Sequence, residues 1–140
     1  MNAPTNIAVT DADRDAQALL ARCRDRRWKL LQQFGCLEIK LQRGLADPPK
    51  TFGSKIRAWI KEDATAKQFE RLIPARNLIA HAFVQCVRAD GVTYALWEIA
   101  DGISDINCRK LDEAALNEWA DDLLGLIQQA VAAASLLNKR

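Results

Sequence analysis

Apolar residues recur at steps of three and four along the first third of the chain, which is the period of one face of an α-helix. Thr10 and Asp13 suit a capping box at the start of this helix. Gly44 and the prolines at 48–49 end it, because proline lacks a backbone donor and disfavours helical geometry in the preceding residue. The pattern predicts one long helix over 10–44. Its apolar face consists of Leu20, Cys23, Leu30, Leu31, Phe34, Leu37, Leu41 and Leu45.

Two shorter helices are expected next. One spans 51–62, with its first threonine as the cap. Its inward-facing residues are Ile56, Trp59 and Ile60. The other opens at a capping box made by Thr65 and Gln68. Pro74 either kinks this helix or starts a new one, and both alternatives place residues 76–81 on helical backbone.

The pattern then changes to that of strands. Residues 83–88 and 92–97 are rich in β-branched and aromatic side chains, and Asp90-Gly91 between them suits a tight turn. We expect a β-hairpin at about 83–99, followed by a polar loop over 101–109. A last helix is capped near Asp112. Its apolar stripe consists of Leu116, Trp119, Leu123, Ile127, Ala130, Ala134 and Leu137.

These elements predict a mainly α fold, an up-and-down helical bundle of four to five helices with one inserted β-hairpin. A chain of 140 residues suits one domain, which we place at 10–140, after a disordered segment over 1–9. That segment has neither the basic start nor the apolar run of a secretory signal. The longest apolar region, 123–137, is too short for a membrane span. We expect a cytoplasmic protein that does not enter a membrane.

Charge and cysteine content exclude little and suggest no cofactor. A net charge of +2 does not identify a nucleic-acid binder by itself. The four cysteines form no Cys-x-x-Cys pair, and one histidine leaves no usual zinc ligand set, so we expect no metal. Two disulfides are an alternative, but we interpret the cysteines as small buried apolar residues in a reducing compartment. They are Cys23, Cys36, Cys86 and Cys108.

Candidate chemistry is concentrated in one segment of helix. Asn77 and His81, the only histidine, are four residues apart and therefore share a helix face. Arg76 is offset from His81 by roughly 140° on an ideal helix, so its side chain must wrap round or meet a histidine of another subunit. The alanines at 75, 80 and 82 are small enough to let a second helix approach closely.

The string Ala75-Arg76-Asn77-Leu78-Ile79-Ala80-His81-Ala82, set in a small helical domain, resembles the signature of HEPN domains: an Arg, a polar residue, three further residues and a His. The resemblance implies a metal-independent endoribonuclease, often the toxin of a toxin–antitoxin or phage-defence pair. It also implies a homodimer, in which two copies of the motif line one cleft. RNA and a cognate antitoxin protein would then be partners.

The chemistry of the three residues suits that role. An imidazole can take a proton from a ribose 2′-OH or give one to the leaving oxygen, so His81 would be the general acid/base. Arg76 would hold the phosphate with its planar fork. Asn77 would orient the ring or donate to a phosphate oxygen. Internal attack by the 2′-OH yields a 2′,3′-cyclic phosphate. One chain cannot supply both a histidine acid and a histidine base, whereas a dimer can.

A structural interpretation of the motif stays open. A lone histidine near the end of a helix is often a structural residue that bonds a nearby carbonyl. In that case the protein would be a non-catalytic HEPN-like module that dimerises and binds a nucleotide, a nucleic acid or a protein. A third alternative is an antitoxin or regulatory subunit without activity of its own.

Other residues are weaker candidates for substrate binding. Arg22, Arg26 and Lys29 share a helix face that could follow an RNA backbone, although a solvated face partly neutralised by a neighbouring aspartate is the alternative. Glu38 interrupts the apolar stripe and needs a partner, either Arg76 or a purely structural cation. The four tryptophans suggest core filling, although Tyr94 and Trp97 on the hairpin could stack on RNA bases.

Overall fold

The computed structural model describes residues 10–99 and 108–137. The elements follow in the order α1 (Asp11–Gly44), α2 (Phe52–Glu62), a 3₁₀ helix (Ala64–Phe69), α3 (Leu72–His81), β1 (Phe83–Ala89), β2 (Val92–Glu98), β3 (Cys108–Leu111) and α4 (Glu113–Ser135). The expected disordered segment 1–9 lies outside the described residues. The fold is mainly α, as predicted, with a three-stranded antiparallel sheet inserted between α3 and α4.

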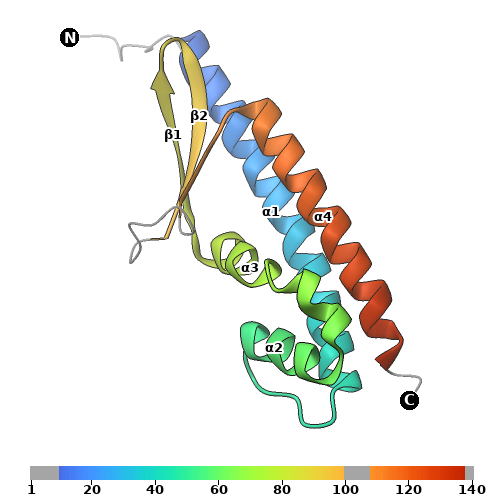
Figure 1. Cartoon of the computed structure of the whole chain (residues 1–140). Coiled ribbons are helices and arrows are strands. Elements are labelled where there is room, and N and C mark those ends of the chain that lie inside the picture. Colours follow the sequence, from blue (N-terminus) through green and yellow to red (C-terminus); the bar gives the residue numbers. More distant parts are fainter. Residues whose placement is uncertain (1–9, 100–107, 138–140) are drawn as a thin grey trace, which may run out of the picture.

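The two long helices, α1 and α4, lie side by side (Figure 1). They run in the same direction, because Arg22 of α1 pairs with Glu113 of α4, and Arg26, one turn later, pairs with Asp121. The 34 residues of α1 span roughly 50 Å at the rise of an α-helix. The sheet returns the chain to the N-terminal end of α1, so it lies beside the first half of that helix, whereas α2 and α3 lie beside the second half (Figure 1).

Local signals begin three of the helices as predicted. The side chain of Thr10 accepts from the backbone N–H of Asp13, and the Asp13 carboxylate accepts from the N–H of Thr10, so the capping box is closed in both directions. Thr51 caps α2 by accepting from the N–H of Ser54. Asp112 caps α4 in the same way.

The third helical segment differs from the prediction. The capping box expected from Thr65 and Gln68 is wrong, because Asp63 caps a short 3₁₀ helix by accepting from the N–H and the hydroxyl of Thr65. The helix α3 then begins separately. Pro74 lies in its first turn, where a backbone N–H has no partner within the helix. Residues 76–81 are helical, as predicted.

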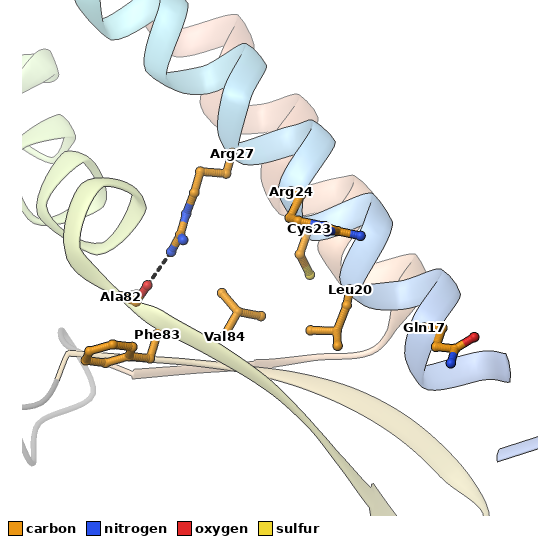
Figure 2. A pocket seen from close by; sticks show the side chains of 8 residues that line it. All are labelled: Gln17, Leu20, Cys23, Arg24, Arg27, Ala82, Phe83 and Val84. Carbon is orange, nitrogen blue, oxygen red and sulfur yellow. Dashed lines mark hydrogen bonds between the residues drawn. The ribbon is translucent and has the colours of Figure 1, made fainter. Parts of the chain in front are cut away.

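The junction between α3 and the sheet is held against α1. Only Ala82 separates the end of α3 from the start of β1, and its N–H closes the last turn of α3 by donating to the carbonyl of Leu78. The guanidinium of Arg27 on α1 donates through Nη2 to the carbonyl oxygen of Ala82 (Figure 2). The end of α3 is therefore fixed to the middle of α1.

The sheet contains the predicted hairpin and one further strand. β1 and β2 pair in antiparallel register around Asp90 and Gly91, whose φ angles of 51° and 77° lie in the left-handed region. The polar loop predicted over 101–109 is wrong at its end, because Cys108–Leu111 forms β3 against β2. Residues 101–107 lie outside the described part. A segment of four residues, of which only Cys108 and Leu111 are apolar, carries no strand pattern of its own, and β3 depends on the hydrogen bonds that β2 supplies.

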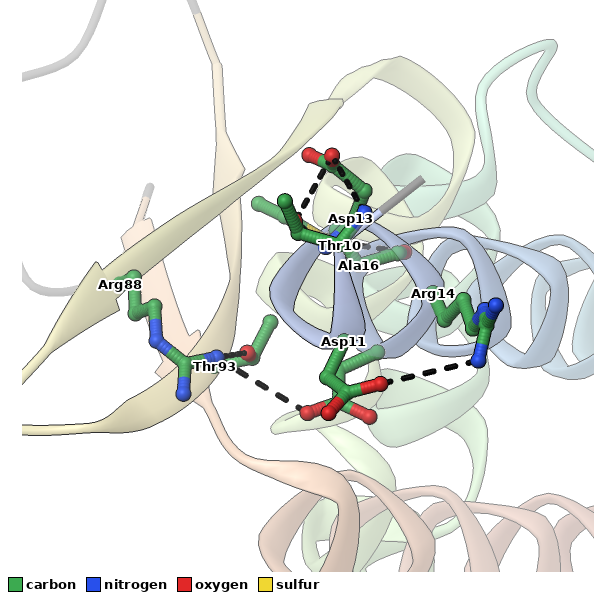
Figure 3. A network of polar contacts seen from close by, with 9 residues as sticks. Thr10, Asp11, Asp13, Arg14, Ala16, Arg88 and Thr93 are labelled. Atoms are coloured by element: carbon green, nitrogen blue, oxygen red, sulfur yellow. Dashed lines mark hydrogen bonds and ion pairs between the residues drawn. The ribbon is translucent and has the colours of Figure 1, made fainter. Parts of the chain in front are cut away.

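The turn end of the hairpin is tied to the start of α1 (Figure 3). Arg88 donates through Nη1 to Oγ1 of Thr93 at 2.9 Å, and the same nitrogen lies 3.8 Å from a carboxylate oxygen of Asp15. The thiol of Cys86 donates to the carbonyl of Ala16 at 3.4 Å. These contacts orient the sheet on the first turns of α1.

Buried apolar side chains from the helices and strands form the core. Trp59 stacks on Phe69 with ring centroids 5.2 Å apart, and Trp97 meets Trp119 edge-on at 5.5 Å. The predicted stripe of α4 lies in this core, with Trp119 at its edge. None of the described helices is long and apolar enough to cross a membrane.

Two expectations about the core are wrong. The side chain of Trp28 is 64% exposed, and Cys36 is exposed as well. Successive residues of an α-helix are about 100° apart, so Trp28 lies about 200° from the buried Leu30 and faces solvent. The residue types at these two positions suggested burial, but their positions around the helix turn both side chains toward solvent. Of the other cysteines, Cys23 is buried, whereas Cys86 and Cys108 are half-buried.

Candidate functional site

Helix α3 presents two polar residues of the motif to solvent. It buries Leu72, Leu78 and Ile79 against the rest of the bundle. On its outer side Asn77 and His81, one turn apart, are both exposed. Within the described part of the chain, no hydrogen bond or ion pair engages the imidazole of His81. Both side chains are therefore accessible to a substrate.

Arg76 faces the inside of the bundle. Its Nη2 lies 3.7 Å from Oε1 of Glu38 on α1, and its guanidinium lies 5.8 Å from the ring centroid of Phe52 on α2. Both side chains of the ion pair are a little over one quarter exposed. Glu38 thus pairs with Arg76, which is one of the two alternatives expected from the sequence. Arg76 links α3 to α1 and α2.

The three motif residues do not form one cluster within a single chain. The contacts of Arg76 are with Glu38 and Phe52, and none joins its guanidinium to Asn77 or His81 among the described residues. This separation is the one expected for residues roughly 140° apart on a helix. A guanidinium and an imidazole could meet only if Arg76 left Glu38 or if a second chain supplied one of the two groups.

The three basic residues of α1 that were candidates for following an RNA backbone have acidic partners. Arg22 pairs with Glu113 at 2.8 Å, and Lys29 pairs with Asp25 at 3.2 Å. Arg26 makes two contacts with α4, with Asp121 at 3.0 Å and Asn117 at 3.1 Å. The two arginines therefore fasten α1 to α4. Of their acidic partners, Glu113 lies in the first turn of α4 and also complements the helix dipole.

The aromatic candidates on the hairpin differ in accessibility. Trp97 is fully buried, so the prediction that it could stack on RNA bases is wrong. Its position in β2 turns it toward the core, where it contacts Trp119. Tyr94 is half-buried, and Nζ of Lys110 lies 4.6 Å from the centroid of its ring. Tyr94 keeps an accessible edge.

A cavity next to α3 is the feature that sequence reasoning missed. It has a volume of about 380 Å³ and opens between α1 and the junction of α3 with β1 (Figure 2). Its main lining residues are Leu20, Arg24 and Arg27 from α1 and Ala82, Phe83 and Val84 from the junction. The run of arginines on α1 was visible in the sequence. The sequence did not show which of these arginines would face the junction, because that depends on how α1 packs against β1.

Burial changes the ionisation of groups beside this cavity. It raises the pKa of the Cys23 thiol to about 11, and the neighbouring Cys86 thiol adds to the shift. Burial also lowers the pKa of the Arg27 guanidinium. At these two positions of the cavity wall, burial therefore disfavours the charged form of the side chain.

The described residues contain no group of three or more His, Cys, Asp or Glu side chains placed to hold a metal ion. The site offers an exposed imidazole, a neighbouring amide, the arginines and the cavity. Comparisons of the chain with protein-family models, with curated proteins and with solved structures found no match.

Proposed function

We propose that this protein is a metal-independent endoribonuclease of HEPN type that acts as a homodimer. In this proposal it is a cytoplasmic toxin of a toxin–antitoxin or phage-defence system, with RNA as substrate and an antitoxin protein as partner. The observation that carries the proposal is the exposed imidazole of His81, which no other described residue engages, beside Asn77 at the end of α3 and within the Arg-polar-x3-His string. A general base must come within hydrogen-bond reach of the proton it takes, and an exposed imidazole allows that.

The weak attachment of Arg76 supports its role as the phosphate clamp. An ion pair of 3.7 Å whose members are each partly exposed contributes little to stability. A phosphate can accept two parallel hydrogen bonds from a guanidinium, which makes a stronger contact. Glu38 would hold Arg76 ready in the absence of RNA and release it to the phosphate. Asn77 would orient the imidazole or donate to a phosphate oxygen.

A dimer completes the acid–base pair. One His81 takes the proton of the ribose 2′-OH while the oxygen of that hydroxyl forms a bond to phosphorus. The bond between phosphorus and O5′ breaks, and His81 of the partner subunit gives a proton to O5′. The products are a 2′,3′-cyclic phosphate and a free 5′-OH, and no metal takes part in the step.

Substitution of the imidazole tests this proposal. Purified protein should cleave single-stranded or transfer RNA in the presence of EDTA and leave cyclic phosphate ends. His81→Ala should lower the rate by 10² to 10⁴, roughly the contribution of a general acid/base. Because His81 is exposed, circular dichroism of the variant should match that of the parent protein. Undiminished cleavage by His81→Ala would remove the nuclease assignment.

The second candidate is a non-catalytic module that dimerises and binds a nucleotide, a nucleic acid or a protein. It is favoured by the contacts of Arg76 with Glu38 and Phe52, which give this arginine a structural role without any catalysis. Expression in cells separates the two candidates. A toxin should slow growth unless its antitoxin is present, and His81→Ala should relieve that effect. A binding module, or an inactive antitoxin or regulatory subunit, should be harmless in both forms.

A further inference from the structure

Two arginines that line the cavity have no counter-ion among the described residues. Arg24 and Arg27 lie about one turn apart on α1. In the described part of the chain, no carboxylate lies within ion-pair distance of either guanidinium. The other arginines in the first half of α1, in contrast, are paired with acidic residues. Among the arginines in the first half of α1, the two without an acidic partner in the described part therefore both line the cavity.

Arg27 is the more constrained of the two. It donates to the carbonyl oxygen of Ala82, its guanidinium carbon lies 4.8 Å from the ring centroid of Trp97, and its Nε is buried without a partner. A partly buried cation without a counter-ion is costly, and proteins usually pair such groups. An anion in the cavity would offset this cost. Arg24 is exposed and free to turn toward the same anion.

The remaining walls fit a flat apolar group. Leu20 and Val84 are apolar and half-buried, and the ring of Phe83 is 72% exposed (Figure 2). A volume of about 380 Å³ lies within the range of small-molecule sites. A ligand that matches both halves of the cavity carries an anionic group against the arginines and a planar ring against the apolar wall. A nucleotide has both parts, and aromatic side chains stack on its base.

We infer that this cavity is a subsite for one nucleotide of the RNA strand, with its phosphate on Arg24 and Arg27 and its base beside Phe83. The inference rests on the proposed function, because His81 directly precedes the cavity residue Ala82. A nucleotide bound here adjoins the scissile bond. The subsite therefore contributes affinity next to the bond that is cut.

Titration with mononucleotides tests the subsite independently of cleavage. Nucleoside 3′-monophosphates are added to ¹⁵N-labelled protein, and amide resonances are followed by NMR. The expected result is saturable shifts of the amides of Ala82, Phe83 and Val84, with tighter binding than inorganic phosphate alone. The inference is overturned if these amides do not respond, or if phosphate alone produces the same shifts at the same concentration.

Variants test the link to RNA. Binding of a short fluorescent RNA is measured in the His81→Ala background, where cleavage cannot interfere. Arg24→Ala should weaken binding about tenfold, as expected for the loss of a charge-assisted hydrogen bond. Val84→Trp should do the same by filling the cavity. The matched control is Arg43→Ala, an exposed arginine near the other end of α1, which should change binding less than about twofold.

The outcomes for the subsite and for the nuclease are distinguishable. If mononucleotides shift the cavity amides but no RNA is cleaved, the proposed function fails and the subsite stands. If RNA is cleaved, while Arg24→Ala and Val84→Trp bind RNA as tightly as the parent protein does, the subsite is wrong and the nuclease stands. Equal losses in Arg24→Ala and Arg43→Ala would show a general charge effect and would also overturn the subsite.

Discussion

Arg76 is the residue whose surroundings most directly separate a structural role from a catalytic one. Its contacts with Glu38 and Phe52 need a positive charge above all, and lysine keeps that charge. Phosphate clamping needs the planar fork, which lysine does not have. The two roles therefore respond differently to the same conservative substitution.

Arg76→Lys should lower the free energy of unfolding by less than about 1 kcal/mol, because the ion pair is partly exposed. It should lower kcat/KM for RNA cleavage at least tenfold, because a point charge cannot replace two parallel hydrogen bonds. Urea unfolding gives the change in unfolding free energy, and initial cleavage rates give the change in kcat/KM. Unchanged kcat/KM would assign Arg76 to the fold alone. Glu38→Gln is the control, since it removes the ion pair and leaves the fork in place.

The buried thiol of Cys23 makes stability depend on pH in the alkaline range. Its pKa rises from an ordinary 9.0 to about 11, because burial disfavours the thiolate. Below pH 9 the thiol is neutral in both the folded and the unfolded state, and its contribution to stability is fully present. Between pH 9 and 11 the unfolded chain loses this proton while the folded chain keeps it, so the contribution is lost as pH rises.

Urea unfolding of the parent protein and of Cys23→Ala at several pH values between 8 and 10.5 checks this dependence. The difference in unfolding free energy between the two proteins should shrink as pH increases. A difference that stays constant would mean that the thiol ionises alike in both states. Cys36→Ala serves as the control, because it removes an exposed cysteine and leaves the buried Cys23 thiol in place.

A helix cap fixes the residue at which the helix after a strand begins. Asp112 follows β3 directly and accepts from the N–H of Ala115 at 2.8 Å. Asp112→Ala should lower the free energy of unfolding by about 1 kcal/mol, because one N–H at the start of α4 loses its acceptor. Asp112→Asn keeps a capping oxygen and should cost less. Chemical denaturation of the three proteins measures both changes, and equal losses for both variants would contradict the capping role.

Elements with strong local signals were predictable from sequence. The capping box of Thr10 and Asp13 located the start of α1, and Asp90-Gly91 located the hairpin turn. The strand β3 was not predictable, because it depends on pairing with β2 and not on its own residues. The cap at Asp63 was missed for a related reason. Several polar residues in that segment could have capped a helix, and packing selected one of them.

Parts of the candidate site's geometry were predictable, but its surroundings were not. Helical phase alone placed Asn77 and His81 on one face, and Glu38 pairs with Arg76, one of the two kinds of partner that the sequence left open. The cavity at Arg27 arises only when α1, α3 and β1 come together. No segment of the sequence carries that information by itself.

At the scale of the whole molecule, the central claim is that two chains share the chemistry. A single chain carries one histidine, and its Arg76 is engaged by Glu38 on the inner side of α3. If both imidazoles act on one phosphodiester, a subunit without His81 inactivates the dimer that it joins. If each chain works alone, such a subunit has no effect on its neighbours.

Mixing active and inactive subunits tests this claim most directly. Parent protein and His81→Ala are unfolded together at several ratios, refolded at constant total concentration, and assayed for RNA cleavage without metal. With two imidazoles per site, activity should fall with the square of the active fraction, to roughly a quarter of the parent value at equal amounts. A linear fall, to roughly half at that ratio, would contradict the shared site.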